Sequence, residues 1–292
     1  MTIPDAQPIP TGPDTDHHFE GPPAPRQWWR DPLLMTGLVI VAVSLFLAAF
    51  GESIAPYNPQ VPVGPPSTPP CAEFWFGTDS SGLDVFSRVI SAPRTDVTLA
   101  VTSAILSAAL GTLIGLVAGF YRGPLSAFIM RVSDVLQAFP VFILAMVLVA
   151  LSGRNLTNLI FALTFLYTPI FIRLTRTEVL TQRERSYVEA ARALGNPGWK
   201  VALRHVLPNS LTPSLIQLSV TVGFGILLTA GLSFVGAGVR PPTPEWGLMI
   251  ANEAPKLVLG EWWPSIFPGI AVSLTVLGYA ALSNAIERRV TA

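Results

Sequence analysis

Six apolar runs alternate with polar segments along the chain of 292 residues. Apart from the fifth, each run is close to the roughly 20 residues that a helix needs to cross the hydrocarbon core of a bilayer. The runs contain no Asp, Glu, Lys or Arg between their ends. The pattern predicts an all-α membrane protein with six transmembrane helices, which cover Pro32 to Gly51, Val97 to Tyr121, Val135 to Gly153, Asn155 to Ile172, Val206 to Val239 and Trp262 to Ile286.

The first run follows a tail, residues 1–27, which is rich in Pro, Asp and Thr and is predicted to be disordered. Trp28, Trp29 and Arg30 suit an anchor at the membrane interface, so the first transmembrane segment is expected over residues 28–51. A signal peptide carries its apolar region close to the N-terminus behind a basic head. Because this run lies behind a long acidic tail, we expect a retained helix.

The fifth run is too long for one ordinary span. Pro208 and Pro213 shorten its start, and Gly231, Gly236 and Gly238 loosen its end. Small residues allow close contact between helices in a membrane, so helix packing is one interpretation of these glycines. The other is a broken, pore-lining segment at the outer mouth, since irregular backbone survives at membrane depth where protein or water covers it.

Composition supports the membrane prediction. The chain is 50% hydrophobic and 12% charged, whereas soluble domains are near 25% charged. Basic and acidic residues balance at 18 each, so net charge gives no indication of nucleic-acid binding. The single Cys71 excludes an internal disulfide and any multi-cysteine metal site.

Arginine placement predicts the orientation. With the N-terminus inside, most arginines face the cytoplasm, as the positive-inside rule requires. Residues 52–96 then form an extracytoplasmic segment, residues 97–286 a core with five further helices, and residues 287–292 a second cytoplasmic tail. The basic residues placed inside are Arg26, Arg30, Arg122, Arg131, Arg173, Arg176, Arg183, Arg185, Arg192, Lys200, Arg204, Arg288 and Arg289.

The loop of residues 173–209 carries the strongest local signals. Ser186 and Glu189 have the spacing of a capping box, and Gly195 suits the left-handed position after a last helical turn. Between them we expect a helix of about two turns with Tyr187, Ala190, Ala191 and Leu194 on one face. A second amphipathic segment has its apolar positions at i, i+3, i+4 and i+7 and ends at Pro208; these positions are Trp199, Ala202, Leu203 and Val206.

The run Glu189-Ala190-Ala191, followed by Gly195 and Leu207-Pro208, resembles the "EAA" cytoplasmic loop of permease subunits of bacterial ABC importers. The fuller string from Tyr187 to Gly195, with Arg204-His205 and Leu207-Pro208-Asn209, is similar to the dipeptide, oligopeptide and nickel branch, and to its second, C-type permease. The resemblance implies the type I importer permease fold. It also implies that the helix in this loop couples to an ATPase subunit through Tyr187, Glu189, Ala190, Ala191, Arg192, Leu194 and Gly195.

The sequence shows none of the usual motifs for nucleotide hydrolysis, nucleophilic catalysis or metal binding. Lys200 and Lys256 are the only lysines, and neither follows the glycines of a phosphate-binding loop. No nucleophile elbow, metal-ligand cluster or facing carboxylate pair emerges. We therefore expect that this chain is not an enzyme and that it binds no metal and no cofactor. Polar groups that could line a path, or equally hydrogen-bond between helices, are Gln137, Asn158, Ser219, Thr221 and Ser233.

The hypothesis from sequence is a multi-pass permease subunit of the bacterial inner membrane, with both termini cytoplasmic. The resemblance implies a homologous second permease, two ATPase subunits or a fused pair that bind ATP and Mg, and an extracytoplasmic binding protein. Lipid surrounds it, and nucleic acid is not a partner. Peptides are the expected cargo; nickel, glutathione, opines or sugars are alternatives. A stand-alone secondary transporter or channel, and a non-transporting membrane scaffold, are the rival functions.

Overall fold

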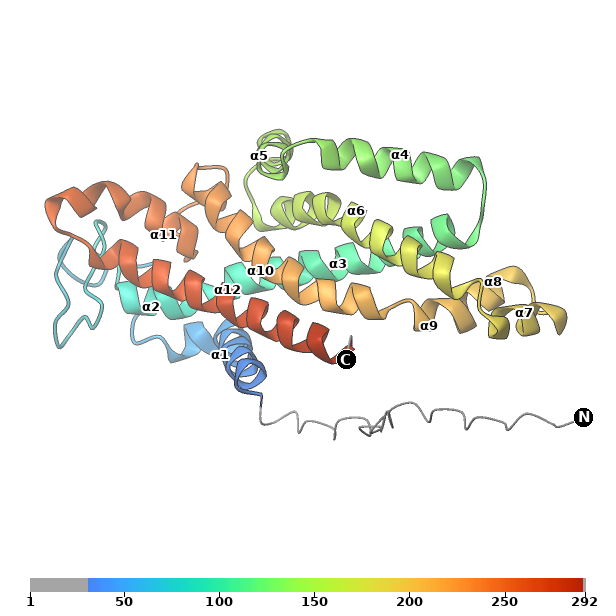
Figure 1. The fold of residues 1–292 in the computed structure, drawn as a ribbon. Coiled ribbons are helices and arrows are strands. Elements are labelled where there is room, and N and C mark those ends of the chain that lie inside the picture. The colour runs from blue at the N-terminus through green and yellow to red at the C-terminus, as the bar shows by residue number, and fades with distance from the viewer. Residues whose placement is uncertain (1–30, 291–292) are drawn as a thin grey trace, which may run out of the picture.

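The computed structural model describes residues 31–290, and within them the regular structure is helical apart from one isolated bridge between Thr78 and Asp84. The predicted tail of residues 1–27 lies outside the described residues. The helices, shown in Figure 1, are α1 Pro32–Ile54, α2 Val85–Ser91, α3 Pro93–Phe120, α4 Pro124–Ala138, α5 Val141–Ser152, α6 Leu156–Gln182, α7 Ser186–Ala193, α8 Gly198–Val201, the π-helix η2 Ala202–Val206, α9 Leu207–Asn209, α10 Thr212–Phe234, α11 Trp246–Glu253, the 3-10 helix η3 Ala254–Leu259 and α12 Trp263–Val290.

Five helical stretches of the described chain are long and apolar enough to cross a membrane. They are α1, the continuous pair α2–α3, α6, α10 and α12. Figure 1 shows α3, α6, α10 and α12 running along the long axis of the molecule, with α7 and α8 together at one end. These helices account for five of the six predicted spans.

The predicted span Val135 to Gly153 is wrong as a single helix. The chain bends by 94° between α4 and α5, and α5 has only 12 residues, or roughly 18 Å. Pro140 causes the break, because proline lacks an N–H and disfavours a helical conformation at the residue before it. Phe139 is accordingly extended, with φ −84° and ψ 143°. By length and composition, α4 and α5 qualify as a membrane span only when this bent pair is taken together.

The fifth run is shortened as expected. Helix α10 begins at Thr212 with Pro213 in its first turn and ends at Phe234. Gly236, two residues after the last residue of α10, has a left-handed φ of +82°, and the chain changes direction there. The connection to α11 is irregular, and its Val239 is buried.

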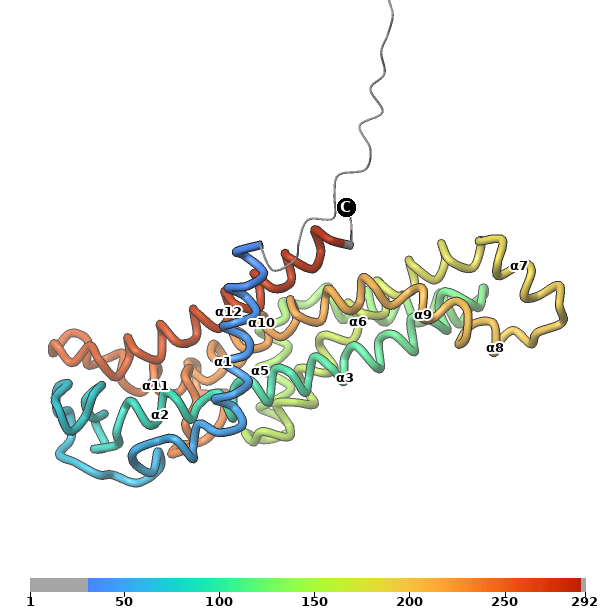
Figure 2. The backbone as a smooth tube through the Cα atoms, turned by 90° about the horizontal axis from the view of Figure 1, so that it is seen from below, coloured from blue at the N-terminus to red at the C-terminus, as the bar shows by residue number. Residues whose placement is uncertain are grey.

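Helix α1 lies against α12 with opposite chain direction. A Cβ added at Gly37 would be 2.7 Å from the backbone nitrogen of Leu282, and one at Gly278 would be 2.4 Å from a side-chain carbon of Ile40. Figure 2 shows α1 crossing the bundle, with its first residues close to the end of α12. The two ends of the described chain therefore lie on the same side. Helix α12 continues through Val290, so much of the predicted tail of residues 287–292 is helical.

Helices α3 and α6 approach each other through glycines. Gly111, Gly115 and Gly119 recur every four residues on α3 and therefore lie on one face. A Cβ at Gly115 would be 2.7 Å from the carbonyl oxygen of Ile172 and 2.9 Å from Cβ of Thr175. Such distances require the two backbones to be in contact, which van der Waals packing rewards inside a membrane.

Gly115→Val is expected to force α3 away from α6 and to destabilise the protein by about 1–3 kcal/mol, the usual cost of overpacking. The measurement is thermal unfolding of the purified protein in lipid nanodiscs. Ala109→Val is the matched control, because Ala109 is an exposed residue of the same helix. Equal midpoints for the two variants would contradict the close contact.

Candidate functional site

Helix α7 is the two-turn helix that the sequence predicts, but it begins differently. Arg185 is its N-cap, and no side chain caps the helix there. Ser186 is instead the first helical residue, so its hydroxyl is not placed to accept the amide of Glu189. The predicted capping box is therefore wrong. The helix starts one residue earlier than predicted, because Arg185 has the extended N-cap conformation, with φ −79° and ψ 145°.

The end of α7 is the predicted glycine cap. Gly195 has φ +79°, and its N–H donates to the carbonyl of Arg192 at 2.9 Å. The N–H of Asn196 donates to the carbonyl of Ala191 at 3.3 Å, and the Asn196 side-chain amide donates to the same carbonyl. These two backbone bonds form a Schellman motif, which satisfies carbonyls at a helix end.

One side of the α7–α8 knob, residues 186–209, packs on the bundle. Val188 and Ala191 are buried among Leu116 and Phe120 of α3 and Val179 of α6. The predicted apolar face divides: Ala191 points inward, whereas Tyr187, Ala190 and Leu194 are exposed. Leu194 is 83% exposed.

The second amphipathic segment also divides its apolar residues. Ala202 and Val206 are buried, whereas Trp199 is 62% and Leu203 46% exposed. The reason is the π-helix over Ala202–Val206, whose wider turn breaks the expected i, i+3, i+4, i+7 spacing. Pro208 does not end the segment, since it lies in the first turn of α9, which continues to Asn209. The exposed side chains give the knob an apolar outer surface.

Arg183, three residues before the knob, ties the end of α6 to the end of α3. It is the C-cap of α6 and only 8% exposed. Its Nη1 donates to the carbonyls of Gly119 at 3.0 Å and Phe120 at 3.3 Å, the last two residues of α3. Those carbonyls have no partner within α3, and a cation at a helix C-terminus is electrostatically favourable.

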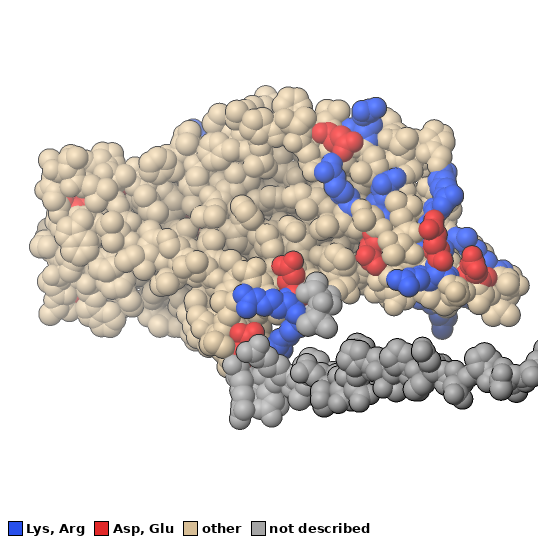
Figure 3. Space-filling model, in the orientation of Figure 1, with Lys and Arg blue, Asp and Glu red and all other residues tan. Residues whose placement is uncertain are grey.

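Charge gathers at the same end of the molecule. Figure 3 shows Lys and Arg side chains concentrated around α7, α8 and the adjoining ends of α4 and α6, with few on the opposite end. Arg173 pairs with Asp134 at 2.7 Å, Arg122 pairs with Glu184 at 3.1 Å, and the Arg192 guanidinium lies 5.3 Å from the ring centre of Phe120. Glu189 and Arg192 border a surface pocket of about 440 Å³.

A groove of about 630 Å³ lies among α4, α5, α6 and α10. Gln137 and Thr221, two of the predicted path residues, line it. Tyr167 and Gln217 line it as well and were not predicted. The signal for Gln217 is its spacing, because a residue four positions before Thr221 lies on the same helix face; its amide is 3.4 Å from the Thr221 hydroxyl.

The other predicted path residues lie outside that groove. The Asn158 side-chain amide donates to the carbonyls of Ser152 and Gly153 and so joins α5 to α6. Ser219 is half-buried on α10 and does not line the groove. Ser233 is buried near the end of α10.

Two of the three glycines of this region are packed against neighbours. A Cβ at Gly231 would be 2.9 Å from the ring of Phe142, and one at Gly238 would be 1.7 Å from Oγ of Ser233. Gly236 has open space around it and serves the backbone turn. The contact at Gly231 joins α10 to α5, as the packing interpretation expects, whereas Gly238 contacts Ser233 of the preceding helix end and not another helix.

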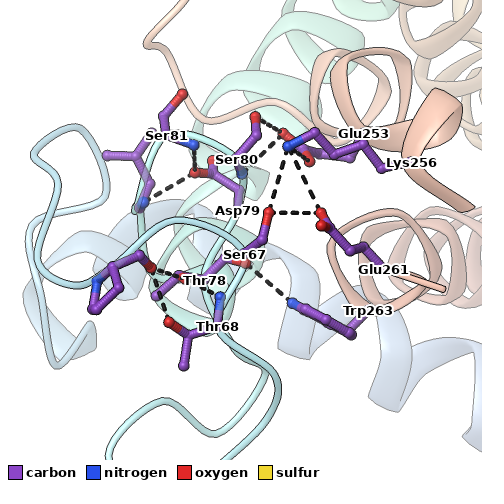
Figure 4. Close-up of polar contacts among 12 residues, drawn as sticks. Ser67, Thr68, Thr78, Asp79, Ser80, Ser81, Glu253, Lys256, Glu261 and Trp263 are labelled. Atoms are coloured by element: carbon purple, nitrogen blue, oxygen red, sulfur yellow. Dashed lines mark hydrogen bonds and ion pairs between the residues drawn. The ribbon is translucent and has the colours of Figure 1, made fainter. Parts of the chain in front are cut away.

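At the end opposite the knob, the loop of residues 55–84 is fastened to η3 and α12, as Figure 4 shows. The Ser67 hydroxyl donates to Glu261 at 2.6 Å, Ser80 donates to Glu253 at 2.5 Å, and Trp263 donates to the carbonyl of Thr78 at 3.0 Å. Lys256 lies between Glu253 and Glu261, at 3.8 and 3.7 Å. This polar network gives the end a fixed shape.

A buried carboxylate pair, which the sequence did not reveal, lies behind that network. Asp96 of α3 is 2% exposed and Glu245, the N-cap of α11, is 0% exposed. Both carboxyl groups accept amides at the start of α11. The expectation that no facing carboxylates occur is thus wrong, because the two residues are distant in sequence and only the fold brings them together.

Arg183→Gln is expected to loosen the knob, because loss of a charged hydrogen bond costs roughly 1.5–3 kcal/mol. Amide hydrogen exchange of residues 186–193, measured by mass spectrometry, should then be about tenfold faster or more. The exposed Arg185→Gln is the control and should exchange like the wild type. Unchanged exchange in Arg183→Gln would contradict the tie to α3.

Comparison with known proteins agrees with this geometry. Residues 111–292 match the family model described as binding-protein-dependent transport system inner membrane component, and residues 24–70 match the N-terminal TM domain of oligopeptide transport permease C. The chain is 34% identical over 257 residues to a probable D,D-dipeptide transport system permease protein of Escherichia coli strain K12, covering 88% of this chain and 86% of that protein.

Two further relatives are similarly close. A dipeptide transport system permease protein of Alkalihalophilus pseudofirmus is 33% identical over 90% of this chain and 86% of its own length. A glutathione transport system permease protein of Pectobacterium atrosepticum is 35% identical over 90% of this chain and 89% of its own length. The predicted fold class is confirmed, and the chain belongs to the inner-membrane permease family of binding-protein-dependent ABC transporters.

Proposed function

We propose that this chain forms, with a homologous second permease, the membrane pathway of an ATP-driven importer of di- and oligopeptides. The observation that carries the proposal is the knob of residues 186–209, which is firmly packed on α3 and α6 while its outer apolar residues are uncovered. An exposed apolar surface bordered by charged side chains is typical of a protein interaction site. We assign it to an ATPase subunit.

The proposed partners are those that the permease family implies. Two ATPase subunits, or one fused pair, bind ATP and Mg and hydrolyse the nucleotide, while this chain is not an enzyme and binds no cofactor. An extracytoplasmic binding protein delivers the cargo to the end formed by residues 55–84, η3 and the start of α12. The knob then lies in the cytoplasm of a bacterial cell, together with both termini.

The coupling residues have distinct positions. Tyr187, Ala190 and Leu194 supply the apolar contact, and Glu189 and Arg192 supply charges beside it. Ala191 packs inward and Gly195 shapes the helix end. The buried face of α7 passes displacement of the knob to α3 and α6, because it packs against side chains of both helices, and Arg183 joins the ends of those two helices.

The groove among α4, α5, α6 and α10 is this chain's share of the pathway. Its polar groups are neutral amides and hydroxyls, which can exchange hydrogen bonds with a peptide backbone without holding it tightly. Its walls are largely aromatic and aliphatic, which suits varied side chains. Names of relatives support a peptide cargo, since they specify D,D-dipeptides, dipeptides and glutathione.

A proton-coupled secondary transporter is the second candidate, and the buried Asp96–Glu245 pair is the one feature that favours it. The two functions differ in what drives uptake. Proteoliposomes with the purified chain alone would accumulate peptide under a proton gradient in that case. In the proposed function, uptake requires the ATPase and ATP.

Replacing Tyr187 and Leu194 together by Ala is expected to abolish co-purification with the ATPase subunit and to reduce ATP-dependent uptake at least tenfold, because the apolar contact is removed. Affinity purification from membranes and uptake into proteoliposomes measure the two effects. Leu45→Ala, an exposed leucine of α1, is the control and should change neither. Normal co-purification of the double variant would exclude the knob as the docking site.

Gln217→Trp is expected to fill the groove and to reduce peptide uptake about tenfold while the ATPase still co-purifies. Leu215→Trp places the same ring on the same helix at a residue that is 61% exposed and outside the groove, so uptake should be nearly normal. Both variants are compared in the same uptake assay. Equal activity of the two would argue against this groove as part of the pathway.

A further inference from the structure

Asp96 and Glu245 divide three consecutive backbone amides between their carboxyl groups. Oδ2 of Asp96 accepts the N–H of Trp246 at 3.1 Å. Oε1 and Oε2 of Glu245 accept the N–H groups of Gly247 at 3.0 Å and Leu248 at 2.6 Å. The start of α11 is therefore held from two sides, by its own N-cap and by a residue of α3.

The described residues supply no cation to this pair. Arg88 of α2 pairs with Asp79, Arg94 of α3 pairs with Glu52, and Lys256 pairs with Glu253 and Glu261. Asp96 and Glu245 are each other's titratable partner, and Ser233 of α10 is the polar side chain that faces Glu245. The dipole of α11 offsets only about half a unit charge.

Two ionised carboxylates buried together without a cation are strongly unfavourable, and one of them then retains a proton. Burial raises the pKa of Glu245, which points the same way. The hydrogen bonds leave room for this proton, since Oδ1 of Asp96 is buried and has no hydrogen-bond partner. With a proton on one of the two carboxyl groups, Oδ1 of Asp96 can take part in a hydrogen bond between that carboxyl group and the other, ionised carboxylate.

We propose that Asp96 and Glu245 bind one proton between them and that this proton-binding site holds α11 against α3. The site lies at the end of the bundle opposite the knob, next to the irregular connection between α10 and α11. Separation of α11 from α3 places both carboxyls in water, where each ionises at neutral pH, so the proton is released. The site thus links protonation to the position of α11.

The sign of the pH dependence follows from linkage. Below about pH 3 both carboxyls are largely protonated in the folded and the unfolded chain. As the pH rises further, the unfolded chain loses two protons while the folded chain keeps one. The folded state therefore loses stability with rising pH, by up to about tenfold in the unfolding equilibrium constant per pH unit, until the shared proton also leaves.

Infrared spectroscopy of the full chain in lipid nanodiscs tests the proposal directly. A protonated carboxyl has a C=O stretching band that an ionised carboxylate lacks. We expect this band in the wild type at neutral pH and its loss in both Asp96→Asn and Glu245→Gln, where the amide donates the hydrogen bond in place of the proton. Asp134→Asn, at a half-exposed carboxylate paired with Arg173, is the control and should keep the band.

Absence of the band from the wild type at neutral pH would overturn the proposal, and this result does not depend on whether the variants fold. Persistence of the band in both amide variants would also overturn it. Thermal unfolding supplies a second measurement: the midpoint of the wild type should fall from pH 5 to pH 8 more steeply than that of Asp96→Asn. The same unfolding measurement is repeated in sodium chloride and in choline chloride. A higher unfolding midpoint in sodium would show that a metal cation binds between the carboxylates, and this result would contradict a shared proton.

Discussion

The backbone contact between α3 and α6 is the constraint on which the other features depend. Glycines at every fourth position let α3 lie so close to α6 that Ile172 and Thr175 would meet any added Cβ. Helix α3 has 28 residues and spans roughly 42 Å. Its C-terminal carbonyls receive Arg183 beneath the knob, and its first turn supplies Asp96 to α11. One helix thus connects both functional ends of the molecule.

Breaks in the other helices are tolerated because their backbone groups find partners. At membrane depth there is no water to satisfy a free N–H or C=O, so irregular backbone must be covered by protein or line a wet cavity. Asn158 satisfies carbonyls at the bend between α5 and α6, Glu245 satisfies amides at the start of α11, and Asp84 caps α2. Asn158, which the sequence offered as a possible path residue, joins α5 to α6 in this way.

Some patterns that act over a few residues were predicted correctly from the sequence. Gly195 after α7 and Pro213 in the first turn of α10 depend only on local backbone preferences, and five of the six spans depend on apolar length. The errors have physical causes as well. Arg185, in an extended conformation, is the N-cap of α7 in place of Ser186, and the π-helix over Ala202–Val206 breaks the regular spacing that the predicted apolar face required. Pro140 broke a run whose composition alone looks continuous.

The candidate site was predictable only in part for a related reason. The residues of the knob are consecutive, so their spacing could be recognised, whereas the groove and the carboxylate pair combine residues from different helices. Nothing near Asp96 in the sequence indicates that Glu245 will face it. Such pairs become visible only when tertiary contacts are known.

The most direct test of the account is a cross-link from the knob. A cysteine placed at Leu194, with Cys71 replaced by Ser, would be treated with a short bifunctional reagent in inside-out membrane vesicles. The account predicts a cross-linked product that contains the ATPase subunit and that is lost when the ATPase is washed off. A product formed instead with the extracytoplasmic binding protein, or labelling only from the outside of intact cells, would contradict it.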